Sequence, residues 1–593
     1  MEKAAIFHDA QGAMVFETGV NAITLRFRSK HEDVAKAELL YGDMYDGPGS
    51  KDEWHPTVAK MKLILRSSSI DFWGVTVQLP KTRRLKYAFH LIASSGEEYL
   101  YDSHKIELYT ADSLTHTAPF IVPYSYPNEA FKQPAWIQNT LWYHILIDRF
   151  ANGDPHSDPE DVVEWRTKEP SNTNFFGGDL QGIKDHLDHF SALGVTGLIL
   201  SPIFAAFSNH KYDAVDPYSV DPYFGRKEDF KGLIEETHQR GMHVVLEIVL
   251  DHLMDFSLQW QDVRQKGENS DFFKWFIIDS LPIEYTPTDD PNFSTDISYQ
   301  VKGNDPHQPK LNLHNAEVRH YLFDLIKYWI ITFDIDGFKI MDPQEMDRSF
   351  LNALMQFVQK IKPGFCLMSE TNSQTPALIN NSILNAAVDQ DVVHILRDYF
   401  VQKKINVAEM ITALNDDMMK YKATSQKSLL LQLDGPYSAR LMSLCEEDGQ
   451  LDRLLLAFIY LLPMSPSLYY GTEFGLKGRR VPANRECMPW KASEQDQTMY
   501  RFIKLLGEFR SENNLILNEG SFNWVQFSNK NDYLSFTRSS NGKRIFALFN
   551  VGYGSIKFVF PPKSRLILSQ NLLEEQNRIG HNGFVIVEAY KKE

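Results

Sequence analysis

The sequence predicts an α/β chain in three parts: a (β/α)8 TIM barrel with an inserted small lobe, an N-terminal β-sandwich and a C-terminal β-sandwich. Residues 1–125 alternate apolar and polar side chains in the period of a β-strand. From residue 139 onward, apolar strand-like runs alternate with amphipathic helical runs, which is typical of parallel α/β architecture. Short alternating strands return after residue 511. With 593 residues, the chain is long enough for several domains.

The N-terminal part, residues 1–125, is a series of short strands separated by Gly, Pro, Asp and Ser. Examples are "AITLRFRS", "SIDFWGVTVQL" and "LKYAFHLIA". Many short strands with turns between them predict a β-sandwich. Residues 126–138 belong to the proline-rich stretch "TAPFIVPYSYPNEAFKQPAW" and are interpreted as a linker.

The central part, residues 139–511, repeats the order of buried strand and amphipathic helix. The strand-like runs are "LWYHILIDRF", "VTGLILSPI", "HVVLEIVLDH", "IDGFKIM", "GFCLMSE", "SLLLQLD" and "SPSLYYGTE". Their span and number fit an eight-stranded barrel. One long interruption, residues 253–312, follows the third strand and predicts a small extra lobe. Residues 512–593, with runs such as "DYLSFTRS" and "RIFALFNV", predict the C-terminal β-sandwich.

Composition and charge exclude several classes of partner and location. The formal net charge of −16 argues against nucleic acid or an anionic membrane surface, since both favour basic proteins. The sequence contains no run of about 18 apolar residues, so it predicts no transmembrane helix. The start "MEKAAIFHDAQGAMVFETG" lacks the apolar core of a signal peptide, and three widely spaced cysteines suit a reducing compartment. We therefore expect a cytoplasmic protein.

The chemistry of such a barrel is expected where its strands end, because these ends converge on one mouth. The candidates at these ends are Glu247, Asp251, His252, Lys339, Met341, Glu370 and Asp434. Carboxylates that end apolar strands can have raised pKa values, and acids facing a common mouth suggest glycoside chemistry. A single acid at a strand end is equally well explained as the cap of a loop.

Several long motifs identify a family resemblance that extends over essentially the whole chain. They are "RFANGDPHSDPEDVVEWRTKEPSNTNFFGGDLQGIKDHLDHFSALGV", "SNHKYDAVDPYSVDPYFG", "QPKLNL", "YGTEFGLKG" and "NRECMPW". The chain resembles the α-amylase superfamily, in particular its neopullulanase, cyclomaltodextrinase and maltogenic amylase group. The N-terminal part resembles the starch-binding-type N-domain of that group. The resemblance implies cleavage of α-1,4 and sometimes α-1,6 glucosidic bonds with retention, which needs two carboxylates about 5–5.5 Å apart.

The resemblance carries several roles onto residues of this chain. Glu370 occupies the position of the acid/base glutamate and Asp434 that of the third acid. Tyr212, within "NHKYD", falls where a ring stacks under the scissile sugar. The other substrate-binding positions are His210, His252, Lys339, Arg485 and Glu247.

Other positions depart from the family pattern. Met341 stands where the nucleophilic aspartate is expected, and a thioether cannot form and release a glycosyl ester. Lys339 replaces an arginine, which keeps the charge but loses the planar fork that grips a carboxylate. Leu433 replaces a histidine that binds sugar hydroxyls. In the motif "EIVLDH", Glu247 replaces an aspartate and Asp251 an asparagine.

Asp342 is a possible shifted nucleophile one residue after the expected position. Side chains alternate along a strand, so if Lys339 and Met341 face the lumen, Asp342 faces the surrounding helices. A β-bulge could turn Asp342 inward, and Pro343 indicates that the regular strand stops here.

The stretch "ANGDPHSDP", together with "FFGGD", resembles the calcium loop of the same group. The resemblance implies hard oxygen ligands for a structural Ca2+ from Asn152, Asp154, Asp158, Asp179 and the carbonyl of Gly177. Ser157 stands where a second asparagine is expected. The alternative interpretation is an Asx-rich turn without a metal.

Three hypotheses of function remain open from the sequence. The first is a catalytically impaired homologue that binds α-glucan, as maltooligosaccharide or cyclodextrin. The second is an active retaining glycosidase that uses a shifted nucleophile such as Asp342. The third is an interaction protein that reuses the shell without binding sugar. A homodimer is implied by the group resemblance alone.

Overall fold

The chain divides by its contacts into two compact units, which are described separately. One unit comprises Met1–Lys132, His394–Lys427 and Leu515–Glu593, and the other comprises Gln133–Val393 and Ser428–Asn514. The structure is a computed structural model that describes residues 1–19, 21–45, 54–110, 112–126, 133–371, 375–380, 382–573 and 577–590.

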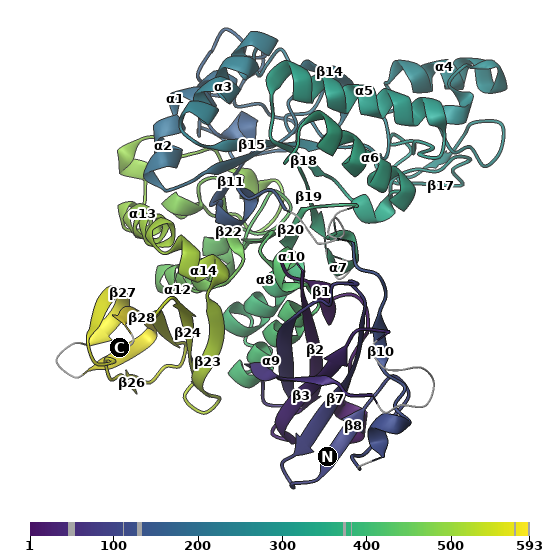
Figure 1. Cartoon of the computed structure of the whole chain (residues 1–593). Coiled ribbons are helices and arrows are strands. Elements are labelled where there is room, and N and C mark those ends of the chain that lie inside the picture. The colour runs from purple at the N-terminus through teal and green to yellow at the C-terminus, as the bar shows by residue number, and fades with distance from the viewer. Residues whose placement is uncertain are drawn as a thin grey trace. The chain divides into compact units, whose positions relative to one another are not determined.

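The second unit contains a closed barrel of parallel strands, as predicted (Figure 1). In order around the barrel, its eight strands within the described residues are β11 (Trp142–Ile145), β12 (Gly197–Leu200), β15 (His243–Ile248), β18 (Gly337–Ile340), β19 (Cys366–Thr371), β20 (Ala386–Asp389), β21 (Leu429–Gln432) and β22 (Ser465–Tyr469). Side chains such as Trp142, Val245 and Met368 are wholly buried in one cluster among these strands. The barrel interior is therefore a packed core, and ligands must approach the strand ends.

Helices follow the strands. The longest, α5, begins after Asn315, whose side chain accepts hydrogen bonds from the amides of Glu317 and Val318, and it ends at the left-handed residue Asp334. The helices of this unit are α1 (Leu180–Asp185), α2 (Leu187–Ala192), α3 (Lys227–Gln239), α4 (Leu258–Lys266), α5 (Ala316–Phe333), α6 (Arg348–Ile361), α7 (Thr375–Leu378), α11 (Leu441–Leu444), α12 (Gly449–Leu461) and α13 (Gln497–Glu512). Helix α8 (Gln390–Leu396) crosses the boundary between the two units.

Strand β20 is the barrel strand that the sequence pattern missed. Its four residues, "AAVD", are too short and too poor in β-branched side chains to stand out as a strand. The structure places it between β19 and β21, where all four residues are buried. Tertiary pairing on both sides supplies the stabilisation that local propensity lacks.

Two insertions lie at the carboxyl side of the barrel strands. A ribbon of β13 (Phe204–Ala206) and β14 (Ala214–Val220) carries the loop that contains Tyr212. The predicted lobe, residues 253–312, contains α4 and the short strands β16 (Thr286–Pro287) and β17 (Ser294–Thr295). An isolated bridge between His252 and Lys310 closes the base of this lobe.

The N-terminal part of the first unit is built of two antiparallel sheets, as predicted. One sheet contains β1 (Val15–Glu17), β2 (Ala22–Lys30), β6 (Ile70–Gln78) and β5 (Lys62–Arg66). The other contains β4 (Thr57–Lys60), β3 (Val34–Gly42), β7 (Leu85–Ala93), β8 (Glu98–Tyr101) and β9 (Ile106–Leu108), with β10 (Phe120–Val122) paired to β7.

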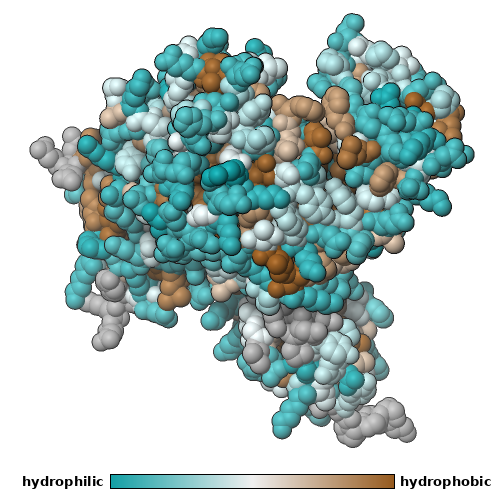
Figure 2. All heavy atoms as spheres, turned by 90° about the horizontal axis from the view of Figure 1, so that it is seen from above, coloured by the Kyte–Doolittle hydropathy of each residue, from teal (hydrophilic) through white to brown (hydrophobic). Residues whose placement is uncertain are grey.

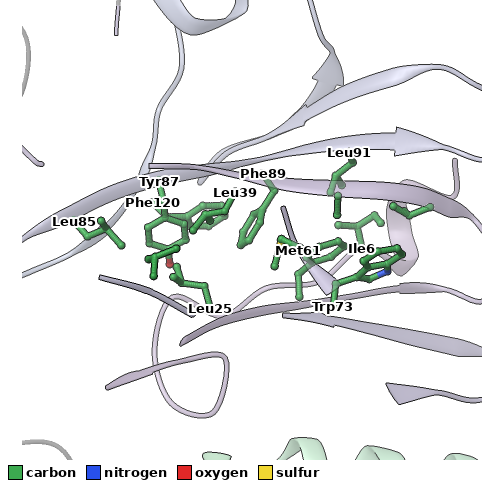
Figure 3. Close-up of a cluster of buried hydrophobic side chains, with 14 of the residues drawn as sticks. Ile6, Leu25, Leu39, Met61, Trp73, Leu85, Tyr87, Phe89, Leu91 and Phe120 are labelled. Carbon is green, nitrogen blue, oxygen red and sulfur yellow. The ribbon is translucent and has the colours of Figure 1, made fainter. Parts of the chain in front are cut away.

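The two N-terminal sheets share one apolar core. Figure 3 shows Leu85, Tyr87, Phe89 and Leu91 pointing from β7 toward the other sheet, which carries Leu25 and Trp73. These side chains are wholly buried at every second position of the strand, which is the period expected of a half-buried sheet.

The C-terminal part of this unit is an antiparallel β domain. Its strands form one hydrogen-bonded sheet: β23 (Ser521–Ser528), β24 (Tyr533–Ser540), β25 (Lys543–Asn550), β28 (Arg578–Tyr590), β26 (Ile556–Lys557) and β27 (Ser564–Leu573). Helices α9 (Val407–Met419), α10 (Ala423–Gln426) and α14 (Asn514–Glu519) accompany these β domains, and α9 contacts both β5 and β23. The segment 394–427 therefore packs with the β domains, although it lies within the predicted barrel range.

The predicted domain bounds at residues 125, 138 and 511 stay predictions. The linker prediction, 126–138, falls partly on residues outside those that the structure describes. In the described part of the chain, no helix is both long and apolar enough to cross a membrane. Figure 2 shows one face, on which hydrophilic residues predominate and apolar residues form small separate patches.

Candidate active site

A cavity of about 460 Å3 lies at the carboxyl ends of the barrel strands. It brings together six residues predicted from the sequence: His210, Tyr212, His252, Met341, Asp342 and Glu370. Its other lining residues are Asp213, Val249, Met254, Lys302, Gln308 and Tyr437. The ends of β15, β18 and β19 therefore converge with the Tyr212 loop and the inserted lobe.

Met341 continues the register of β18 by one residue. Its backbone amide donates to the carbonyl of Ile248 at 3.0 Å, although the regular strand ends at Ile340. Two residues earlier, Lys339 pairs with Glu247 across β15 and β18, and its side chain points to the barrel interior. The side chain of Met341 thus lines the cavity wall at the end of β18.

Asp342 lines the same cavity, although regular alternation would turn it toward the helices. Its backbone is left-handed, with φ 48° and ψ 49°, so the alternation of the strand stops at this residue. Its carboxylate forms an ion pair with Lys302 of the inserted lobe and accepts a hydrogen bond from Gln344 Nε2 at 3.1 Å. The sequence left both orientations of Asp342 open, and the structure shows it at the cavity, because the turn before Pro343 reorients the residue.

Beneath the cavity, Glu247 and Lys339 form an ion pair with no solvent exposure. Lys339 Nζ lies 2.9 Å from Glu247 Oε1, which also lies 3.2 Å from His144 Nε2, and the Tyr212 hydroxyl donates to Glu247 Oε2. Burial by itself would raise the pKa of Glu247, but Lys339 and His144 hold it well below its usual value. Burial would likewise lower the pKa of Lys339, but Glu247 and Glu370 raise it.

Glu370, at the end of β19, is partly exposed to the cavity and engaged at both oxygens. Lys339 Nζ donates to Oε2 at 3.1 Å, and Gln390 Nε2 donates to Oε1 at 2.7 Å. The side chain retains 32% exposure. Glu370 therefore accepts a hydrogen bond at each of its oxygens.

Two tyrosines form an aromatic wall. The ring of Tyr212 lies 5.8 Å from that of Tyr437, with 47° between their planes. Beside them, burial lowers the pKa of His210 to about 4, so its imidazole is neutral at pH 7. Flat aromatic faces next to neutral polar groups suit the apolar face and hydroxyl rim of a sugar ring.

Besides the buried pair Glu247 and Lys339, two further predicted site residues, Asp434 and Arg485, do not line the cavity. Asp434 is almost wholly buried and accepts hydrogen bonds from the amide of Leu441 at 3.0 Å and the hydroxyl of Thr472 at 3.1 Å. Arg485 donates to the carbonyl of Pro436 at 3.2 Å, with its guanidinium 5.5 Å from the ring of Tyr437. Both side chains support the loop that presents Tyr437.

Sequence reasoning missed four residues that shape this site: His144, Lys302, Gln390 and Tyr437. Tyr437 stands three residues after Asp434, in "LDGPY", where the turn residues Gly and Pro could have signalled a presented side chain. Gln390 follows the missed strand β20 directly. His144 and Lys302 had no local signal, because their roles depend on contacts with Glu247 and Asp342 far along the chain.

Two family descriptions match the chain and decide its classification. "Alpha amylase, catalytic domain" matches residues 144–515, and "Alpha amylase, N-terminal ig-like domain" matches residues 1–125.

The chain belongs to the α-amylase family of glycoside hydrolases.

Its relatives in this family include enzymes of the predicted group. The intracellular maltogenic amylase of Bacillus subtilis (strain 168) is 34% identical over 93% of this chain and 92% of the relative. A cyclomaltodextrinase of Geobacillus thermopakistaniensis (strain MAS1) is 30% identical over 97% of this chain and 95% of the relative. A solved cyclomaltodextrinase structure superimposes with a TM-score of 0.88 at 26% identity, covering 100% of this chain and 98% of that one. The resemblance to the neopullulanase, cyclomaltodextrinase and maltogenic amylase group is thereby confirmed.

The loop that resembles the calcium site of the α-amylase family ends at Asp179, which caps helix α1. Asp179 accepts hydrogen bonds from the amides of Gly182 at 2.6 Å, Gly153 at 3.0 Å and Asp154 at 2.7 Å. Burial raises the pKa of Asp179 to about 6, although these hydrogen bonds oppose the rise. Both carboxylate oxygens already accept hydrogen bonds from backbone amides. Asp179 is therefore the least available of the expected ligands to coordinate a calcium ion.

The rest of this loop retains oxygen donors that suit calcium. Asn152 Nδ2 donates to both oxygens of Asp158, at 2.9 and 3.0 Å, and Asn152 Oδ1 is buried without a hydrogen-bond partner. The Ser157 hydroxyl donates to the carbonyl of Asp154 at 2.8 Å. In the part of the chain that the structure describes, no three His, Cys, Asp or Glu side chains group as a metal site. Amide and carbonyl oxygens would therefore have to complete the coordination.

Proposed function

We propose that the barrel cavity binds an α-glucan, as a maltooligosaccharide or cyclodextrin, and that hydrolysis is lost or greatly reduced. The observation that carries the proposal is Met341, at the end of β18 on the cavity wall. Retaining cleavage needs a carboxylate that attacks the anomeric carbon and later leaves from it. A thioether packs against a sugar but provides no such carboxylate.

The surroundings of Met341 support impaired catalysis. Lys339 stands where the family pattern has an arginine, and its ammonium is shared between Glu247 and Glu370. A single ammonium lacks the planar fork that orients a nucleophilic carboxylate. Because Glu370 also accepts a hydrogen bond from Gln390, it is arranged to bind donors such as sugar hydroxyls.

Retained binding is supported by the aromatic wall and the dimensions of the cavity. Tyr212 and Tyr437 offer ring faces, and a cavity of about 460 Å3 is in the range of small-molecule sites. The names of relatives such as cyclomaltodextrinase and maltogenic amylase support an α-glucan as the ligand class.

The test measures binding and turnover on the same preparation of the full chain. We expect maltotriose and β-cyclodextrin to bind by isothermal titration calorimetry, while product release stays near the uncatalysed background. Tyr212→Ala should weaken binding about tenfold, since one aromatic contact contributes roughly 1–1.5 kcal/mol. Glu370→Gln is the matched control for turnover. Hydrolysis that Glu370→Gln abolishes would contradict the proposed loss of catalysis, and absence of binding would favour the interaction-protein hypothesis.

A second candidate function is hydrolysis with Asp342 as a shifted nucleophile. The observation that favours it is the left-handed turn that brings Asp342 into the same cavity as Glu370. Its carboxylate is paired with Lys302, so attack on a sugar would require that this pair open. Turnover that disappears in both Asp342→Asn and Glu370→Gln would establish this alternative.

We further propose that the 152–179 loop holds a structural calcium ion. Asn152, Asp154, Asp158 and the carbonyl of Gly177 would be its ligands, and the partnerless amide oxygen of Asn152 is the observation that favours it. We expect added Ca2+ to raise the melting temperature of the EDTA-treated chain, and Asp158→Asn to reduce that rise. An identical melting temperature with and without Ca2+ would support the metal-free Asx-rich turn.

A homodimer and a cytoplasmic location complete the proposal. The group resemblance supports the homodimer. The intracellular description of the Bacillus subtilis relative supports the cytoplasmic location. Sedimentation velocity at micromolar concentration distinguishes a dimer of about 137 kDa from the 68.4 kDa monomer, since the dimer has twice the monomer mass.

A further inference from the structure

A second cavity, of about 950 Å3, lies in the C-terminal β domain. It is larger than the barrel cavity and is lined by residues of β24, β25, β26 and β28. Figure 1 labels β24, β26 and β28. Lys403, from the segment before α9, completes its wall. No residue is common to this cavity and the barrel cavity.

Part of the lining of this cavity is apolar and aromatic. Phe546 and Phe558 stack with centroids 5.9 Å apart and 25° between their planes. Both belong to the cluster that also contains Leu548 and Tyr533. Such a lining favours a ligand with at least one apolar face.

Tyr553 is an exposed aromatic platform at this cavity. Its side chain is 92% exposed, yet its ring stacks on that of His581 with centroids 4.6 Å apart and 22° between planes. His581 Nδ1 lies 3.1 Å from the carbonyl of Gly552, which fixes the orientation of the imidazole. A large ring held flat but uncovered is suited to stacking against a ring of a ligand.

The cavity is basic in a chain that is strongly acidic. Lys403, Lys530, Lys557 and Arg578 line it, whereas the formal net charge of the whole chain is −16. The acidic residue in its lining is Asp532, whose carboxylate already accepts a hydrogen bond from the Tyr399 hydroxyl at 2.7 Å. This concentration of positive charge favours an anionic ligand.

One of these cations is fixed in place. Arg578 Nε donates to the Ser555 hydroxyl at 2.7 Å, and the same guanidinium contacts the Ser555 carbonyl. Ser555 and Lys557 belong to one short segment beside Tyr553, so the aromatic platform and the cations are close along the chain. A ligand that stacks on the platform therefore has cationic partners nearby for an attached anion.

We propose that this cavity binds a phosphorylated saccharide. The sugar ring would lie against the uncovered face of Tyr553, whose other face stacks on His581, and the phosphate would face Lys403, Lys557 and Arg578. Amide and hydroxyl groups of Gln526, Asn531 and Ser535 are available for the sugar hydroxyls. The inference is independent of the function proposed for the barrel.

The test uses the full chain and isothermal titration with four probes: glucose 6-phosphate, glucose, inorganic phosphate and AMP. Glucose 6-phosphate should bind at least about tenfold more tightly than glucose or phosphate, because it engages both the platform and the cations. Its affinity should fall when NaCl rises from about 50 to 500 mM, since salt screens the phosphate contacts. Equal binding of inorganic phosphate, or tighter binding of AMP, would overturn the proposal.

Two substitutions of residues that line the cavity test whether glucose 6-phosphate binds there. Tyr553→Ala and Lys557→Gln should each weaken glucose 6-phosphate binding about tenfold. Their matched controls are Tyr45→Ala, at a tyrosine that is 66% exposed in the N-terminal part, and Lys81→Gln, at an exposed lysine there. Unchanged affinity in both cavity variants, or an equal loss in the controls, would assign the binding elsewhere and overturn the proposal.

Discussion

At the scale of single residues, the barrel site depends on which groups Met341 and its neighbours provide to the cavity. Met341 provides no carboxylate where β18 reaches the cavity, while Glu370 is still present at the end of β19. The family resemblance pointed to Met341, and the strand register predicted that it shares a face with Lys339, since side chains two apart on a strand share a face. The position of Asp342 was not predictable, because it depends on a left-handed backbone and on Lys302, forty residues away.

We predict that Met341→Asp raises hydrolysis of maltotriose at least about tenfold over the unmodified chain. The substitution returns a carboxylate to the in-register wall position, and combining it with Lys339→Arg should raise the rate further, because catalytic groups act as a unit. Product formation is measured by chromatography at one substrate concentration. Met341→Asn is the matched control, and equal rates for the Asp and Asn variants would contradict the prediction.

A second residue-scale prediction concerns Asp452 of α12. Its side chain is wholly buried, neither carboxylate oxygen has a hydrogen-bond partner, and burial raises its pKa well above the ordinary value. The folded chain thus keeps a proton that the unfolded chain releases above about pH 4, so Asp452 lowers stability as the pH rises from there.

Asp452→Leu should therefore increase the free energy of unfolding at pH 7 by about 1–3 kcal/mol. The difference from the unmodified chain should shrink toward pH 4, where the aspartate is protonated in both states. Urea denaturation at several pH values measures this difference. A difference that is constant with pH would show that the carboxyl group does not titrate as we expect.

At the scale of elements, the strong patterns were predictable and the weak ones were not. Seven barrel strands stood out as apolar runs bounded by turn residues, and α5 by its helical period. Strand β20 did not, because its four residues are stabilised by pairing with β19 and β21 rather than by propensity. Gln390, which contacts Glu370, was missed for the same reason.

An element-scale prediction concerns the start of α9. Asn406 Oδ1 accepts from the amide of Glu409 at 3.1 Å, and the Glu409 carboxylate accepts from the amide of Asn406 at 2.8 Å. Asn406→Ala removes half of this capping box and should cost about 1 kcal/mol of stability. Chemical denaturation measures the loss. Asn406→Ser is the matched control and should retain most of the stability, and equal losses would argue against capping.

At the scale of the whole molecule, the chain does not divide into domains in simple sequence order. The unit with the β domains also contains residues 394–427, which connect barrel strands β20 and β21. Within that unit, Asn415 Nδ2 donates to the carbonyl of Arg66 at 3.0 Å, and Trp524 Nε1 donates to Asn415 Oδ1 at 2.8 Å. Helix α9 is therefore held by both β domains.

We predict that deletion of residues 1–132 accelerates amide hydrogen exchange in α9 by at least about tenfold. The helix would lose β5 and the carbonyl of Arg66, and exchange rates report such local opening. Mass spectrometry of peptides from 407–419 measures the change. Peptides covering β15 of the barrel unit serve as the internal control, and unchanged exchange in α9 would contradict the prediction.

The sequence by itself determined the family and the barrel with its flanking β domains, and it predicted that Met341 stands at the nucleophile position. These follow from local periodicity and from motifs, which are properties of neighbouring residues. Only the tertiary structure decided that Asp342 enters the cavity, that Asp434 and Arg485 stand behind Tyr437, and that Glu370 is engaged by Lys339 and Gln390. Each of these depends on a backbone turn or on a contact between distant segments, which no local pattern encodes.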